Sequence, residues 1–190
     1  MTPSMQSPQY HLQSTLAAFA LDGPVSLTFL PYAARFSLRL SENDVTEASG
    51  ALGLDLPTTI GEVIRRGTRS ALRLGPDEWV LYTEEADEKA LASASAALYE
   101  SVPHSFVDIG NREIALSLKG TQVITVLSVG CLADLRDMPV GSGRRTVFYS
   151  ASVVIHRDAE DEFRIEVWRS FLPHVWELLN IANRELGTGY

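Results

Sequence analysis

The sequence has one cysteine, Cys131, and no long apolar run. A single thiol cannot form an internal disulfide, and we therefore expect the protein in the reducing cytoplasm. No stretch approaches the 18 or so apolar residues that predict a membrane-spanning helix. The first 22 residues contain neither lysine nor arginine, and their apolar run, 16–21, is short. The sequence therefore does not predict a secretory signal.

Positive charge is also scarce. The chain has 16 Lys and Arg against 24 Asp and Glu, which gives a formal net charge of −8. Nucleic-acid binding needs a basic face, and this balance does not favour one.

The 190 residues, 45% hydrophobic and 21% charged, are typical of a globular protein of one large domain or two small ones. Residues 1–24 begin with a segment rich in Ser, Gln and Pro, which predicts a flexible arm.

Apolar periodicity and turn residues predict the elements of the chain. In the first half these are a strand at 34–40, a helix after Ser41 that ends near Gly53, a strand near 59–65, strands at 70–74 and 78–83, and a helix at 86–99 with Ala90, Leu91, Ala94 and Leu98 inward. In the second half these are a strand at 112–118, a helix from Gly120 to Gly130, strands near 144–149, 151–157 and 163–168, and a helix at 171–186 whose apolar stripe is Phe171, Leu172, Val175, Trp176, Leu179 and Ala182.

The two halves share this order of elements, which indicates an internal duplication. We match Phe36-x-Leu38-x-Leu40 with Ile114-x-Leu116-x-Leu118, Pro57 with Pro139, and Trp79 with Phe163. The predicted fold class is α+β, with two pseudo-repeated strand–helix–strand halves that share a largely antiparallel sheet in one compact unit. The predicted domain is 25–190, with repeats at about 25–100 and 106–187.

Metal and phosphate sites lack their usual spacing. The four histidines, His11, His104, His156 and His174, form neither HxH nor HxxxH, so we predict no metal ligands. His156 falls in a predicted strand and is read as a core or a surface histidine, whereas His174 should be solvated. Gly141-Ser142-Gly143-Arg144-Arg145 contains only GxG and precedes a strand, whereas a dinucleotide fingerprint needs GxGxxG before a helix. A flexible turn before a basic strand end is the better interpretation.

Nucleophilic and acid–base catalysis find no support either. Cys131 follows a predicted helix C-terminus, where the dipole disfavours a thiolate, so we predict a buried structural thiol. The arginines Arg65, Arg66, Arg69 and Arg73 could bind a carboxylate or phosphate, but we favour a solvated face or a rim that meets an acidic partner.

The segment LGPDEWVLY, 74–82, places two carboxylates beside a tryptophan. Asp77 and Glu78 are adjacent at a strand entry and should point to opposite faces, so they make a poor catalytic pair. Pro76 and Asp77 fit a turn, and Trp79 should anchor the core. We predict no catalytic, cofactor-binding or metal-binding residue in this chain.

Several separated segments, in order, resemble the gamma subunit of heterotetrameric sarcosine oxidase. They are LTFLPYAARFSLRL (27–40), LGPDEWVLY (74–82), FVDIGNREIALSLKG (106–120), GCLADL (130–135) and FRIEVWRSFLPHVWELL (163–179). The resemblance covers about residues 25–186 and leaves out the first 24. It implies a fold like the tetrahydrofolate-binding region of the glycine-cleavage aminomethyltransferase.

The resemblance also implies a function within a complex. That complex oxidatively demethylates sarcosine to glycine, with hydrogen peroxide and formaldehyde or methylenetetrahydrofolate as the other products. The implied partners are the alpha, beta and delta subunits. FAD, FMN and NAD are expected in alpha and beta, zinc in delta, tetrahydrofolate within the complex, and no cofactor in this chain.

The role implied for this chain is a non-catalytic assembly subunit. Two alternatives remain: a free-standing folate-binding one-carbon protein, and a gamma-like subunit of an oxidase or dehydrogenase for another N-methyl amino acid. Candidate interface segments are residues 1–24 and 131–143.

Overall fold

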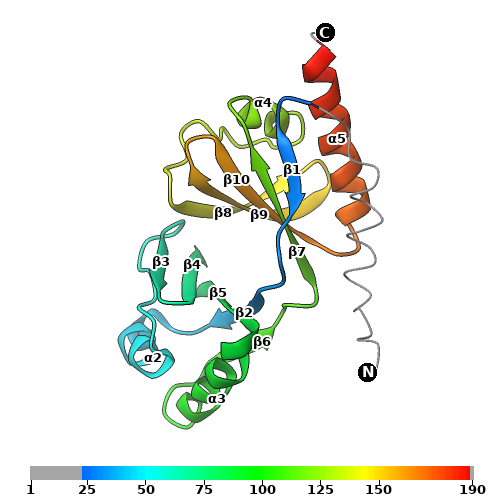
Figure 1. Ribbon diagram of the computed structural model, residues 1–190. Coiled ribbons are helices and arrows are strands. Elements are labelled where there is room, and N and C mark those ends of the chain that lie inside the picture. The colour runs from blue at the N-terminus through cyan, green and yellow to red at the C-terminus, as the bar shows by residue number, and fades with distance from the viewer. Residues whose placement is uncertain (1–22, 189–190) are drawn as a thin grey trace, which may run out of the picture. The chain divides into compact units, whose positions relative to one another are not determined.

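The structure is a computed structural model and describes residues 23–188 (Figure 1). It forms two compact units that are interleaved along the chain. Within the described residues, unit 1 comprises 23–30, 111–138 and 146–188, and unit 2 comprises 31–110 and 139–145. None of the helices in 23–188 combines the length and apolar character that crossing a membrane requires. All of the predicted arm but Gly23 and Pro24 lies outside the described residues.

Unit 1 is built on a five-stranded sheet with the order β1-β7-β10-β9-β8. The strands are β1 (Ser26–Phe29), β7 (Glu113–Lys119), β8 (Ser142–Phe148, which begins in unit 2), β9 (Ala151–Ala159) and β10 (Glu162–Trp168). The helices α4 (Val123–Ser128) and α5 (Leu172–Thr188) contribute their buried apolar side chains to the same core as the strands. The apolar stripe of α5 is buried as predicted, except that Phe171 precedes the helix and is exposed.

Unit 2 is built on a second five-stranded sheet, with the order β3-β4-β5-β2-β6. The strands are β2 (Ala34–Arg39), β3 (Val63–Arg66), β4 (Arg69–Gly75), β5 (Glu78–Thr83) and β6 (Ser105–Asp108). Its helices are α2 (Val45–Leu52) and α3 (Glu88–Leu98), each preceded by a single 3₁₀ turn, Glu42–Asp44 and Glu85–Asp87.

The ends of α2 follow from the residues that flank it. The Ser41 hydroxyl accepts a hydrogen bond from the Asn43 N–H at 3.3 Å and caps the turn that leads into the helix. Gly53 ends the helix with φ of 62°, a left-handed conformation that glycine adopts without a steric penalty. One prediction for α3 is wrong: Ala90 is exposed, and Ser95 takes the buried place between Leu91 and Leu98.

The two sheets are separate, so the predicted shared sheet and single compact unit are wrong. The α+β class with antiparallel pairing is confirmed. The two units interleave because each half gives its leading strand to the other half's sheet. β1 precedes β2 in the chain but pairs with β7, and β6 precedes β7 but pairs with β2. The duplication itself stays a prediction, and the equivalent strand orders β6-β2-β5-β4-β3 and β1-β7-β10-β9-β8 are the observation in its favour.

The register of the sheets corrects the predicted match between halves. Leu38 pairs with Trp79, and Leu118 pairs with Phe163. If Trp79 corresponds to Phe163, Leu38 corresponds to Leu118 rather than to Leu116. A shift of two residues keeps the same side chains on the same face, so alternation alone could not detect it.

Candidate functional site

The described histidines do not form a metal site. His156 is fully buried in β9, with Nε2 4.0 Å from a Glu166 carboxylate oxygen, which settles the core-or-surface alternative. His104 is half-buried, and its Nδ1 donates to the Val102 carbonyl at 2.7 Å. His174 is exposed, as predicted, and His11 lies outside the described residues. Across 23–188, no three His, Cys, Asp or Glu residues are grouped so that they could hold a metal ion.

The glycine–arginine segment forms a turn and an ion pair. Gly141 has φ of 81° at the turn before β8. Arg145 donates two hydrogen bonds to the two carboxylate oxygens of Glu78, at 2.8 and 2.6 Å. The bidentate geometry fixes both planar groups and excludes other ligands from that face of the guanidinium. The segment therefore forms a turn and binds Glu78 of unit 2 through Arg145. This agrees with the interpretation as a turn before a basic strand end.

The carboxylates of LGPDEWVLY do not converge on an open site. Asp77 is exposed at the turn between β4 and β5, whereas Glu78 is buried at the start of β5. Arg39 on β2 reaches both, at 3.2 Å to each. With Arg145 on Glu78 as well, the two carboxylates are held by arginines that link three segments of unit 2.

The predicted arginine cluster is divided by the fold. Arg65 and Arg66 are exposed on β3, the edge strand of the sheet. Arg73 is buried and donates to the carbonyls of Thr58, Pro76 and Gly75 and to the Glu42 carboxylate. Arg69 is half-buried and bonds Asp87. The prediction of a single solvated face or rim is therefore wrong for Arg69 and Arg73, because backbone carbonyls and carboxylates of the same unit bind them.

The Arg69–Asp87 pair should make the stability of the fold depend on pH. The hydrogen bond from Arg69, with a second from Thr83, lowers the pKa of the Asp87 carboxyl from its ordinary 3.8. A lowered folded-state pKa contributes stability above the unfolded-state pKa, and that stability is lost as pH falls through the folded value. Asp87→Asn should therefore lower the free energy of unfolding at pH 7, and its difference from the wild type should shrink below about pH 3.8.

Urea unfolding of both proteins between pH 2.5 and 7 measures this difference. Asp55→Asn is the matched control, because Asp55 is exposed in the same unit. A difference that stays constant over this range would contradict the pairing of Asp87 with Arg69.

Each unit contains a buried arginine stacked on a buried aromatic ring. In unit 2 the Arg73 guanidinium lies 5.0 Å from the centre of the Trp79 ring, and in unit 1 Arg157 lies 5.5 Å from that of Phe163. Arg157 donates to the Met138 carbonyl, just before Pro139, as Arg73 donates to that of Thr58, just after Pro57. In both units the arginine lies on the strand next to that of the ring and is its pairing partner. This agrees with the match of Trp79 to Phe163.

Cys131 is buried beside β8, with Sγ 3.9 Å from the Thr146 hydroxyl. This agrees with the interpretation as a structural thiol.

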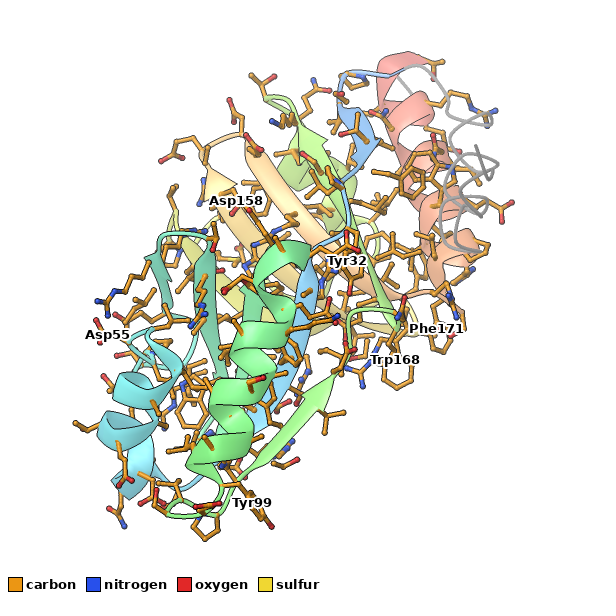
Figure 2. The ribbon with its side chains drawn as sticks, turned by 60° about the horizontal axis from the view of Figure 1, so that its bottom comes forward. Tyr32, Asp55, Tyr99, Asp158, Trp168 and Phe171 are labelled. Carbon is orange, nitrogen blue, oxygen red and sulfur yellow. The ribbon has the colours of Figure 1, made fainter. Side chains whose placement is uncertain are left out.

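A buried ionic cluster in unit 1 was missed by the sequence analysis. Arg164 on β10 lies 3.1 Å from Glu166 and 3.5 Å from Asp158, which Figure 2 labels, and Glu166 also faces His156. The side chain of Glu166 has no exposed surface. Because a buried charge needs a counter-charge, the cluster is explained as a mutually compensated set on one sheet face. The available signal was Arg164-x-Glu166 in an otherwise apolar strand.

Unit 1 exposes an apolar surface around Leu132, within the segment 131–143 predicted as an interface. Leu132 is 93% exposed, and Val129 and Tyr149 beside it are about half exposed. Together with His174 they line a shallow groove of about 430 Å³. The charged residues that line the adjoining groove with Leu132, Asp134 and Arg136, pair with each other at 2.7 Å. We call this uncharged area the Leu132 surface.

A second exposed feature of unit 1 is aromatic. Trp168 at the end of β10 and Phe171 before α5 lie side by side, with ring centres 6.3 Å apart (Figure 2). The Arg112 guanidinium lies 4.9 Å from the centre of the Trp168 ring. The two exposed rings are tilted by 46° to each other, and the positive charge of Arg112 lies over the Trp168 ring.

Unit 2 has a groove between α3 and β6, which lie side by side in Figure 1. We call it the α3–β6 groove. Its volume is about 420 Å³, and its lining consists of Phe36, Ala92, Ser95, Ala96, Tyr99, His104, Phe106 and Asp108. The rings of Phe36 and Phe106, which both line the groove, stack with their centres 4.5 Å apart.

Comparisons with known proteins identify relatives of the chain. The model of the family "Sarcosine oxidase, gamma subunit family" matches residues 42–185. A chain of the heterotetrameric sarcosine oxidase from Corynebacterium sp. U-96, solved with pyrrole 2-carboxylate, is 28% identical, with a TM-score of 0.84 over 97% of both chains. A search of curated proteins finds no match.

A more distant structure shows the same fold. The glycine cleavage system aminomethyltransferase T from Bartonella henselae is 15% identical, with a TM-score of 0.60. The match covers 91% of this chain and 52% of the aminomethyltransferase, so the chain spans about half of that protein. The predicted aminomethyltransferase-like fold is therefore confirmed.

Proposed function

This chain belongs to the sarcosine oxidase gamma subunit family, and we propose that it serves as the gamma subunit of a heterotetrameric sarcosine oxidase. The observation that carries the proposal is the match to a chain of the Corynebacterium enzyme, at a TM-score of 0.84 over 97% of both chains. A match that covers both chains almost completely favours the same place in the same kind of assembly.

The proposed activity belongs to the complex. It is the oxidative demethylation of sarcosine to glycine, with partners of the alpha, beta and delta type. We place FAD, FMN and NAD in alpha and beta, zinc in delta and tetrahydrofolate in a partner. Three carboxylates of this chain pair with its own arginines. Glu78 pairs with Arg145, Asp87 with Arg69, and Glu166 with Arg164. Groups engaged in this way support a structural role for the chain.

The fold provides a reason to consider a second function. Similarity to an aminomethyltransferase favours testing the full chain for folate binding, although a shared fold does not determine function. Calorimetric titration of the isolated chain with tetrahydrofolate separates the two functions. Binding at micromolar concentration would favour a free-standing folate protein, and no binding is expected of an assembly subunit.

The principal experiment is co-expression of a tagged chain with the alpha, beta and delta subunits. A yellow complex that retains flavin absorbance through affinity and size-exclusion steps is the expected result. Recovery of the tagged chain alone would reject the proposal.

The Leu132 surface supplies a matched pair of variants for the same experiment. Leu132→Asp places a charge on an uncharged apolar surface and should lower the yield of the complex at least several-fold, because burying an unpaired carboxylate opposes association. Ile60→Asp changes an exposed apolar residue of unit 2 and serves as the control. Equal yields from both variants would remove Leu132 from the interface.

A further inference from the structure

Within residues 23–188, the strand β6 lies at one edge of its sheet. Of the described strands it pairs with β2 alone, in antiparallel register, and the Ile109 N–H donates to the Arg35 carbonyl at 2.8 Å. Because hydrogen-bonding direction alternates along an antiparallel strand, Val107 bonds toward β2, whereas the backbone groups of Phe106 and Asp108 point away from it. The edge of β6 therefore presents N–H and C=O groups in the spacing that an added strand would use.

The edge of β6 carries only part of what usually prevents strand addition. Edge strands are commonly blocked by short length, lysine, proline, a bulge or charged side chains, and β6 has a length of four residues and one charge, Asp108, but no lysine or proline. The opposite edge of the same sheet, β3, carries the exposed arginines Arg65 and Arg66. In contrast, β6 reads Ser-Phe-Val-Asp, and Val107 is 51% exposed.

The α3–β6 groove lies beside this edge and would receive alternate side chains of an added strand. Phe106 and Asp108 are two residues apart and point to the same face, which is the face that α3 covers. Across from them, Ala92, Ala96 and Tyr99 lie at helical spacing along α3. The alanines leave room, and Tyr99, 63% exposed at the end of the helix, offers its ring (Figure 2).

The other end of the groove is acidic. Asp108 lines it, and Glu88 begins α3 four residues before Ala92, on the same side of the helix. Burial raises the pKa of the Tyr32 hydroxyl, and the negative charges of Glu88, Asp108 and Glu85 raise it further, against the opposing charge of Arg35. Among the described residues that line the groove, none is a lysine or an arginine.

We propose that the α3–β6 groove binds an extended segment of another subunit, which adds a strand to β6 and places an arginine or lysine side chain along the groove. The cation would stack on Tyr99 or Phe106 or pair with Asp108 and Glu88, and the backbone of the segment would bond Phe106 and Asp108. The inference rests on the proposed function, since it assumes that the chain is part of a complex.

Cross-linking in the assembled complex tests the position of the segment. Val107 is replaced by p-benzoylphenylalanine in the co-expressed complex, and Ile60, a similarly exposed residue of the same unit, carries the same replacement as the control. We expect a cross-link from position 107 to a basic segment of another subunit, and none from position 60. A complex that forms without a cross-link from position 107, or with one to an acidic segment, overturns the inference.

The charge of Asp108 is tested separately. Asp108→Asn keeps the side-chain oxygen that accepts the Gly110 N–H at 2.8 Å, so the local turn is preserved. Loss of the charge should weaken subunit association on the order of tenfold, and the effect should fade at high salt. Asp55→Asn, which removes an exposed carboxylate of the same unit, should have no effect. Equal affinities of the two variants would contradict the acidic role of the groove.

Amide exchange in the intact complex reports strand addition directly. The outward amides of Phe106 and Asp108 should exchange as slowly as that of Val107, which bonds to β2. Fast exchange at 106 and 108 beside a slow 107 would exclude an added strand. These outcomes differ from a failure of the proposed function, in which no complex would be recovered at all.

Discussion

Replacing Trp79 with alanine should lower the free energy of unfolding by about 3–5 kcal/mol, the usual range for removal of a fully buried large aromatic side chain. The ring has no exposed surface and packs in the core of unit 2. Its Nε1–H donates to the Pro57 carbonyl at 2.9 Å, and the Arg73 guanidinium stacks on its face. The substitution removes all of these contacts and leaves a cavity. Urea unfolding followed by circular dichroism measures the change.

Trp168→Ala is the matched control, since the same side chain is lost from an exposed position at the end of β10 (Figure 2). Its effect should be about 1 kcal/mol, the usual size for a point substitution, because the side chain is 42% exposed and the space it leaves is open to solvent. Similar losses for both variants would show that Trp79 is not the anchor of unit 2.

Arg73→Ala should lower the free energy of unfolding by about 2–4 kcal/mol, because a hydrogen bond from a charged donor contributes about 1.5–3 kcal/mol and several are lost together, while water can reach the partly buried carbonyls that remain. The side chain is buried and donates to three backbone carbonyls in addition to Glu42. It also covers the Trp79 ring, so its loss loosens the packing there.

Arg66→Ala provides the comparison for Arg73. Arg66 belongs to the same run of arginines in the sequence but is exposed on the edge strand β3. Its replacement should change stability by less than about 0.5 kcal/mol. If Arg66 and Arg73 gave equal effects, the division of the cluster into structural and exposed arginines would be wrong.

Local features of the sequence predicted the central elements well. The alternation in 34–40 and the Gly-Pro-Asp-Glu turn gave β2 and the β4–β5 hairpin, and the Ser41 and Gly53 caps gave the limits of α2. These signals act over a few residues, so the sequence alone carries them. The four-residue strands β1 and β6 carry too little alternation to be recognised, and their exchange between the halves depends on pairing partners far along the chain.

The functional surfaces were harder to predict from the sequence, because they too depend on contacts between residues far apart in the chain. Glu78 and Arg145 lie 67 residues apart, and spacing could not show that they form a bidentate pair. The arginine run looked uniform until the β4 pairing placed Arg73 inward and the β3 edge placed Arg66 outward. The α3–β6 groove is made by a helix and an edge strand, and that strand was not predicted. The segment 131–143 was predicted only as a candidate interface, and the 93% exposure of Leu132 required the structure.

The most direct test of the central claim is the mass of the purified complex. The tagged chain is co-expressed with the alpha, beta and delta subunits, and native mass spectrometry is recorded on the flavin-containing fraction. We predict a single assembly that contains one copy of each subunit and loses 20.9 kDa, plus the mass of the tag, when this chain is ejected. A flavin-containing assembly of the other three subunits that excludes this chain would contradict the assignment.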